Sequence, residues 1–242
     1  LQGLIGYTAA MKKGVTPLPE ANGKKADLEG KAFEALLRQN GLTPPANGFA
    51  KTAEEAGEEA SAIGFPVVLK IVSPQASHKT EVGGVALNLI DEASVIEAAE
   101  EMKEKLNSVD AEAVVDGFLV QEMVSGTEVI VGVREDPQFG PFMIVGLGGV
   151  LVEAVRDIAF RMLPVTDEDA RDMLNELRGK SILGKFRGAP PRDIDALVGA
   201  ICGLSKIFAQ HRKFLADLEV NPLIVGAEGE GVRAVDVRPV WR

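Results

Sequence analysis

Apolar residues recur along this chain with two spacings, one typical of helices and the other typical of strands. Spacings of three and four predict helices at residues 33–41, 52–63, 94–106 and 194–208, and a further helix is expected after Thr166. Apolar, β-branched runs bounded by glycine or proline predict strands. These strands are expected at residues 65–72, 85–90, 118–124, 128–134, 141–155, 160–165, 215–225 and 232–237.

The ends of the expected helices carry their own signals. Thr52 with Glu55, and Ser94 with Glu97, have the spacing of a capping box, so each pair is expected to open a helix. Gly41 suits the position just past a helix end, where glycine adopts the left-handed conformation at little cost.

Together these elements predict an α+β fold of two lobes, divided near residue 118. Residues 28–118 are expected to form the N-terminal lobe and residues 119–242 the C-terminal lobe. Residues 1–27 have the composition of a tail and linker that follow a preceding domain. Because the chain begins with Leu1 and not with methionine, it is expected to be a piece of a longer protein.

Composition and charge exclude several functional classes. Hydrophobic residues make up 46% of the 242 residues, enough for a real core. The net charge of −10 argues against nucleic acid as a partner, because such a protein carries a basic face. No apolar run is long enough for a membrane span, and no secretory signal opens the chain. A single cysteine, Cys202, fits a reducing compartment, so a cytoplasmic location is expected.

The strand at 65–72 and the loop after it hold the first candidate chemistry. Lys70 is a charge inside an apolar run, so it either reaches a ligand or extends its stem to water. Gly83 and Gly84 allow the backbone to approach phosphate, although a glycine pair is also common in plain turns. Lys79 adds a positive charge, and His78 is either a transient nucleophile towards phosphorus or an ordinary solvated residue.

The last two strands hold a candidate metal site. Alternation along a strand places Asp217, Glu219 and Asn221 on one face. If the turn centres on residues 228–229, Val225 pairs with Val232 and Asn221 lies opposite Asp236. Carboxylate and amide oxygens at that spacing suit Mg²⁺, whereas the alternative is an acidic strand face in water. The glycines of residues 146–149 either line a ligand or form a bulge.

The order of these segments resembles the ATP-grasp fold, in which two α+β lobes enclose a nucleotide site. The closest resemblance is to the nucleotide-binding subunit or domain of the NDP-forming acyl-CoA synthetases, such as ADP-forming acetyl-CoA synthetase and the related succinyl-CoA synthetase. The strings that carry it are Leu69-Lys-Ile-Val-Ser-Pro-x-x-x-His-Lys-Thr-Glu-Val-Gly-Gly-Val, Gln121-Glu-Met-Val-x-Gly-x-Glu-Val, Asp136-Pro-x-Phe-Gly-Pro, Gly146-x-Gly-Gly-x-x-Val-Glu, Phe160-Arg-x-x-Pro and Glu219-Val-Asn-Pro-Leu.

The resemblance implies a role for each candidate residue. Lys70 would contact the nucleotide phosphates, and the loop at Gly83 and Gly84, with Lys79, would cover them. His78 would carry the phosphoryl group between the nucleotide and a distant acyl-CoA site. The remaining implied residues are Gln121, Glu122, Met123 and Val124 at the adenine edge, Glu128 near the nucleotide, and Asn221 and Asp236, with Glu219 as a third candidate, at Mg²⁺.

The implied activity is that of an acid–thiol ligase: acyl-CoA + ADP + phosphate ⇌ carboxylate + CoA + ATP. Its cofactors are ATP or ADP and Mg²⁺. In this family the CoA-binding half is a separate subunit or a fused N-terminal region, so the chain is expected to be active only with that half, which also binds the small carboxylic acid and CoA. An oligomer is therefore expected. Two alternatives stay open: a regulatory ATP-grasp-like domain, as in synthetase-like protein acetyltransferases, and an ATP-grasp carboxylate–amine ligase.

Overall fold

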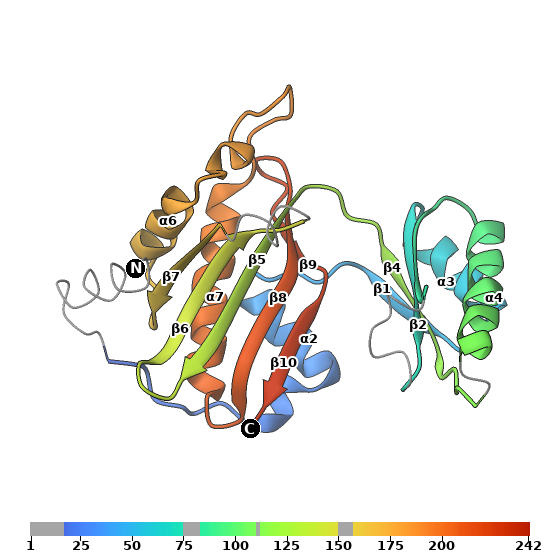
Figure 1. Ribbon diagram of the computed structural model, residues 1–242, viewed down its shortest axis with the longest axis horizontal. Helices are drawn as coiled ribbons and strands as arrows, with labels where there is room; N and C mark the ends of the chain where they lie inside the picture. Colours follow the sequence, from blue (N-terminus) through green and yellow to red (C-terminus); the bar gives the residue numbers. More distant parts are fainter. Residues whose placement is uncertain (1–16, 75–82, 110–111, 150–156) are drawn as a thin grey trace. The chain divides into compact units, whose positions relative to one another are not determined.

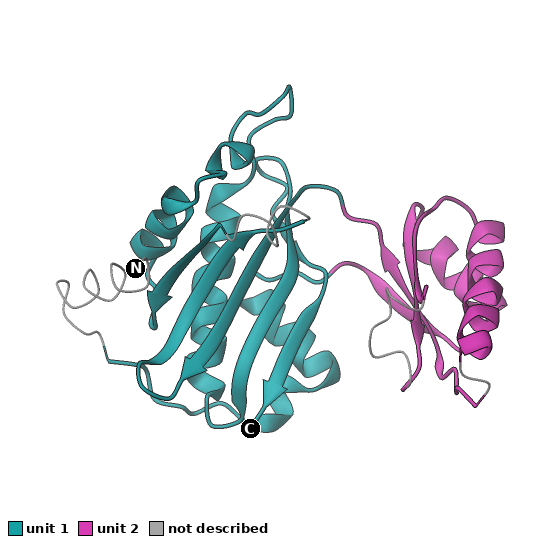
Figure 2. Cartoon of the chain, viewed as in Figure 1, with its two compact units in different colours: residues 1–44, 125–242 teal, residues 45–124 magenta. Residues whose placement is uncertain are grey.

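A computed structural model describes residues 17–74, 83–109, 112–149 and 157–242 of the chain. The chain forms two compact units (Figure 2). The smaller unit is Pro45–Val124, and the larger unit combines Leu1–Pro44 with Ser125–Arg242. Each unit has its own sheet and its own apolar core.

The smaller unit is an antiparallel sheet of four strands, in the order β1-β4-β2-β3, with helices α3 and α4 packed on one face (Figure 1). In β2 and β4, successive side chains point to opposite faces of the sheet. In β2, Val67, Leu69 and Ile71 are buried against the helices, and the intervening residues lie on the other face. The element bounds are β1 Asn47–Ala50, α3 Ala53–Ile63, β2 Val67–Val72, β3 Val85–Leu89, α4 Glu92–Val109 and β4 Gly117–Glu122.

One helix start in this unit differs from the expectation. Thr52 caps α3 as predicted, with its side chain accepting a hydrogen bond from the Glu55 amide. Helix α4, however, begins before Ser94, because Asp91 accepts the Ser94 amide at 2.8 Å and Ser94 Oγ accepts the Asp91 amide at 3.3 Å. Ser94 is thus the inner partner of a reciprocal cap and not the capping residue itself.

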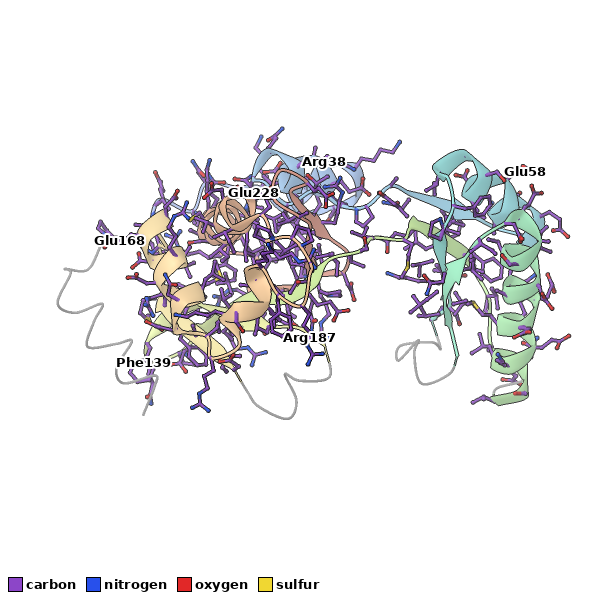
Figure 3. All side chains as sticks on the ribbon, turned by 90° about the horizontal axis from the view of Figure 1, so that it is seen from above. Arg38, Glu58, Phe139, Glu168, Arg187 and Glu228 are labelled. Carbon is purple, nitrogen blue, oxygen red and sulfur yellow. The ribbon has the colours of Figure 1, made fainter. Side chains whose placement is uncertain are left out.

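The larger unit is a sheet in the order β10-β8-β5-β6-β7, with β9 paired to β8. Helices α7, α2 and α6 lie behind this sheet. Helix α7 is in the middle and packs into the core, with α2 and α6 on either side of it (Figure 1). The exposed charged side chains of Glu168 on α6 and of Arg187 lie at the periphery (Figure 3). The element bounds are η1 Lys25–Leu28, α2 Gly30–Gln39, β5 Thr127–Asp136, β6 Gly140–Leu147, β7 Ile158–Met162, α6 Asp167–Glu176, η2 Lys180–Leu183, α7 Ile194–His211, β8 Leu215–Val225, β9 Val232–Ala234 and β10 Val237–Trp241.

The division between the units differs from the expected boundary near residue 118. Strand β4 belongs to the smaller sheet and β5 to the larger one, so residues 125–126 connect the two units. Helix α2 belongs to the larger unit, because Leu37 packs into its core. The expected strand at 232–237 is also interrupted, since β9 ends at Ala234 and β10 begins at Val237.

Within the described residues, no helix combines the length and the apolar character that a membrane crossing requires.

Candidate functional site

Lys70 lies in the middle of β2, on the sheet face that α3 and α4 do not cover. Its side chain is half-buried, and its Nζ donates a hydrogen bond to Gln121 Oε1 at 2.9 Å. Gln121 is in β4, and only 5% of it is exposed. The structure therefore places the lysine within the sheet, with a polar partner, and not at a free strand edge.

The second candidate feature is the row of backbone amides at the end of β4. The Glu122 amide donates to the Ala46 carbonyl at 2.8 Å, and the Met123 amide donates to the Pro66 carbonyl at 3.1 Å. The Glu122 carboxylate accepts a hydrogen bond from the Ala46 amide at 3.1 Å, so this side chain closes β1 onto β4. Among the described residues, no hydrogen bond engages the Val124 amide, which lies directly after these two occupied amides.

The glycine pair follows the loop between β2 and β3. Gly84 is buried, and its carbonyl accepts the Ile71 amide at 2.9 Å. Gly83 has φ of +70°, a conformation that strains other residues. His78 and Lys79 lie outside the described residues.

Glu128 is an exposed residue of β5 in the larger unit. Its carbonyl accepts the Gly148 amide at 2.7 Å. A Cβ atom at Gly148 would lie 2.5 Å from Glu128 Cβ, so only glycine fits against this residue. The segment that contains Gly148 thus passes close to the backbone of Glu128.

The three candidate metal ligands lie in the larger unit, where β8 meets β9 and β10. Val225 pairs with Val232 as predicted, and the same register brings Asn221 opposite Asp236, with the Asn221 amide donating to the Asp236 carbonyl at 2.9 Å. Asn221 Nδ2 donates to Glu219 Oε1 at 3.1 Å, so these two side chains share a face.

This donor set fits Mg²⁺ in its chemistry, because two carboxylates and an amide oxygen are the hard ligands that this ion takes. The hydrogen bond to Glu219 engages the side-chain nitrogen of Asn221, so the side-chain oxygen is the atom that would bind a cation. Asp217, on the same strand, instead forms an ion pair with Arg134 at 3.3 Å. Among the described residues no group of three or more His, Cys, Asp or Glu side chains is placed to hold a metal ion, so a site here would also need the amide oxygen of Asn221.

Two neighbours of these residues were not predicted from the sequence. Arg238 in β10 is in register with Glu219, and Arg192 Nε donates to Thr127 Oγ1 at 2.9 Å, next to Glu128. Arg192 lies 65 positions after Thr127, and local spacing carries no signal for such a contact. Arg238 follows from the same register that places Asn221 opposite Asp236, so the sequence carried a signal for it.

Comparisons with known proteins found similarity in family, in sequence and in fold. Residues 20–240 match the family model described as an ATP-grasp domain. The chain is 38% identical over 223 residues to the beta subunit of acetate–CoA ligase [ADP-forming] II of Pyrococcus furiosus, covering 92% of this chain and 94% of that protein. It is also 37% identical to the 4-hydroxybutyrate–CoA ligase [ADP-forming] of Nitrosopumilus maritimus, of which it spans 31%.

Solved structures of acetyl-coenzyme A synthetase 1 of Ca. Korarchaeum cryptofilum share the fold. One, with coenzyme A and Ca-AMPCP, has a TM-score of 0.79 and 37% identity, covering 100% of this chain and 99% of that one. Another, with coenzyme A and Mg-AMPPCP, has a phosphohistidine segment that points towards the nucleotide binding site; its TM-score is 0.73 at 36% identity, covering 98% and 99%.

Proposed function

Because this chain belongs to the ATP-grasp family, and within it to the beta subunits of the ADP-forming acyl-CoA synthetases, we propose that it binds ADP or ATP with Mg²⁺ and transfers the phosphoryl group in the reaction acyl-CoA + ADP + phosphate ⇌ carboxylate + CoA + ATP. The observation that carries this proposal is Lys70, a lysine held by a buried amide on the sheet face opposite helices α3 and α4. The relatives reported above are CoA ligases, which favours this reaction over a regulatory domain or a carboxylate–amine ligase.

Lys70 would neutralise charge on the nucleotide phosphates. Phosphoryl transfer needs mainly positioning and charge neutralisation, and an ammonium on a rigid strand supplies both. Gly83 and Gly84 would let the backbone approach the same phosphates, with Lys79 as a further cation. The occupied amides at the end of β4 support an adenine contact through the Val124 amide, because a purine ring nitrogen is a hydrogen-bond acceptor. The backbone of Gln121, Glu122 and Met123 would frame this edge, and Glu128 is a further candidate for contact with the nucleotide.

Asn221 and Asp236, with Glu219, would hold Mg²⁺. When bound, the ion supplies positive charge to the phosphate oxygens. Hydrogen bonds hold these residues in place relative to one another. The Asn221 backbone amide donates to the Asp236 carbonyl, and the Asn221 side chain donates to Glu219.

His78 would be the residue that carries the phosphoryl group. It attacks the γ-phosphorus through a neutral ring nitrogen, the P–O bond to ADP breaks, and phosphohistidine and ADP result. The relative with a phosphohistidine segment supports this role. The thioester would form on a CoA-binding partner, as the name "subunit beta" of the Pyrococcus furiosus relative supports. We propose a cytoplasmic location and an oligomer formed with that partner.

Nucleotide binding tests this function directly. We expect ADP with Mg²⁺ to raise the melting temperature of the chain, because a ligand that binds only the folded state stabilises it by mass action. Lys70→Ala removes a charge-assisted contact to phosphate and should abolish most of this shift. Lys51→Ala, which removes an exposed lysine from the same unit, is the control and should keep it. The proposal is wrong if no nucleotide shifts the melting temperature at millimolar concentration.

A further inference from the structure

Arg238 in β10 carries a positive charge on the same sheet face as the candidate metal ligands. Its neighbour Val237 packs against the core of the larger unit, so Arg238 points to the opposite face, where it is exposed. Glu219 lies directly across from it on β8 and points the same way, because the residues on either side of Glu219 are buried in that core. The guanidinium group therefore shares a face with Glu219 and Asn221.

Arg238 lies opposite a carboxylate but is not paired with it. Strand residues directly opposite each other have Cβ atoms about 4.5–5.5 Å apart, within reach of an ion pair. Glu219 Oε1 instead accepts the side-chain amide of Asn221 at 3.1 Å. Within the part of the chain that the structure describes, no hydrogen bond or ion pair engages the Arg238 side chain. Arg134, on the same face, is by contrast paired with Asp217 at 3.3 Å.

The charge balance of this face favours a cation at Arg238. Glu219 and Asp236 are both carboxylates, so a bound Mg²⁺ would do little more than offset their charge. The phosphates of a nucleotide bring further negative charge, and the net charge of −10 on the chain provides no general attraction for them. A guanidinium group beside the metal ligands reduces this repulsion, and its planar fork of donors matches the oxygens of a phosphate.

The sheet also leaves room for a ligand on the other side of Glu219. The residue in register there is Gly132 of β5, and a Cβ atom added to it would lie 3.6 Å from Glu219 Cγ, an ordinary contact distance. Packing against Glu219 therefore does not require glycine at this position. A glycine inside a strand often marks the close approach of a ligand, which agrees with a ligand over this part of the sheet.

We propose that Arg238 binds the phosphate chain of the nucleotide, as a protein cation of the larger unit that acts beside the metal ion. The inference rests on the proposed function, because it needs Mg-nucleotide to bind at Asn221 and Asp236. The guanidinium group would donate directly to phosphate oxygens, so its role differs from that of Glu219 and Asp236, which would contact the metal.

Substitutions that separate charge from geometry test the proposal, with dissociation constants for Mg-ADP and for adenosine measured by calorimetry. Arg238→Gln should weaken Mg-ADP by about tenfold, the effect of losing a charge-assisted hydrogen bond, and should leave adenosine unchanged because adenosine has no phosphate. Arg238→Lys keeps the charge but loses the fork, so its affinity for Mg-ADP should lie between the two. Arg38→Gln removes an exposed arginine of α2, behind the sheet (Figure 3), and is the matched control, which should bind as the parent does.

The outcomes separate this inference from the function beneath it. If Lys70→Ala weakens Mg-ADP and Arg238→Gln does not, the inference is overturned and the proposed function stands. Equal losses from Arg238→Gln and Arg38→Gln would show a general effect of charge, and equal losses for Mg-ADP and adenosine would show a role in the fold; either would overturn the inference. If the parent itself does not bind Mg-ADP, the proposed function is wrong and the inference falls with it.

Discussion

Lys70 is tolerated in an apolar strand in part because a neighbouring side chain accepts a hydrogen bond from its ammonium group. Burying an ammonium without a partner is costly, and the Gln121 carbonyl at 2.9 Å offsets part of that cost. On the other face of the same strand, Leu69 is fully buried against the helices. The partner that helps this residue type fit at this strand position is thus a residue 51 positions later in the chain.

The residue-level test of the chemistry is His78. His78→Ala should leave Mg-nucleotide binding at the parent value but abolish phosphate transfer, because alanine has no ring nitrogen to attack phosphorus. In the parent, label from γ-labelled ATP should appear on this chain as an acid-labile, base-stable adduct at position 78. Labelling of the alanine variant to the parent level would contradict the relay role.

For single residues, the alternation of side chains along a strand allowed sequence analysis to predict which residues lie opposite each other. It placed Asn221 opposite Asp236, and the register confirms that pairing. It gave no indication that Gln121 would meet Lys70, because that contact depends on β4 lying beside β2, an order that no local pattern determines.

Among the elements, α7 and the turn between β8 and β9 are joined by one carboxylate. Asp193 Oδ1 accepts the Ala196 amide at 3.0 Å and so caps the helix. Its Oδ2 accepts the amides of Gly229 and Gly231, each at 3.0 Å, and holds the turn. These hydrogen bonds, that of the Ala196 amide above all, lower the pKa of Asp193.

Removing this carboxylate should therefore affect more than one element. We expect Asp193→Ala to lower the free energy of unfolding by about 1–2 kcal/mol, the upper part of the range for a helix cap. Asp195→Ala is the control, because that exposed residue of the same helical turn forms a surface ion pair with Arg171 and should change stability by less than about 1 kcal/mol. Urea unfolding measures both, and equal effects would contradict the linking role.

The capping patterns were partly predictable from the sequence. Thr52 and Thr166 begin their helices as expected, whereas Asp91 and not Ser94 caps α4. Two overlapping candidates three residues apart satisfy the same rule, and only packing decides between them. The interruption between β9 and β10 was also not predicted; it lies opposite Pro222, which has no amide hydrogen to donate to a neighbouring strand.

For the whole molecule, both units depend on carboxylates that accept backbone amides. The pKa values of Asp27 and Asp193 in the larger unit, and of Glu54 and Asp91 in the smaller one, are lowered by such hydrogen bonds. A carboxylate with a lowered pKa stabilises the fold above its unfolded pKa, and this contribution is lost as the pH falls through the folded value.

Acid should therefore destabilise the protein. We expect the melting temperature to be level near neutral pH and to fall below about pH 4, where these groups begin to take up protons. Thermal unfolding followed from pH 7 to pH 3 measures this. Asp91→Asn should make the decline less steep, and a melting temperature that rises on acidification would contradict the expectation.

The two-lobe organisation was predictable from the sequence, but its boundary was not. Hydrophobic alternation predicted both β4 and β5, yet it cannot tell that consecutive strands join different sheets. The connection between them includes Gly126, where a Cβ atom would lie 2.4 Å from the Val225 carbonyl oxygen. That constraint comes from a strand about a hundred residues later, so it becomes visible only in the folded chain.

The single tryptophan, Trp241, lies in β10 of the larger unit, with Lys25 Nζ 5.6 Å from its ring centroid. The smaller unit, Pro45–Val124, contains no tryptophan or tyrosine. Tryptophan and tyrosine fluorescence therefore does not report on the unit that contains Lys70 and Gln121, whereas circular dichroism reports on both units. An emission change on denaturation would report the larger unit only, and a dichroism transition that does not coincide with it would reveal that the two units lose their structure separately.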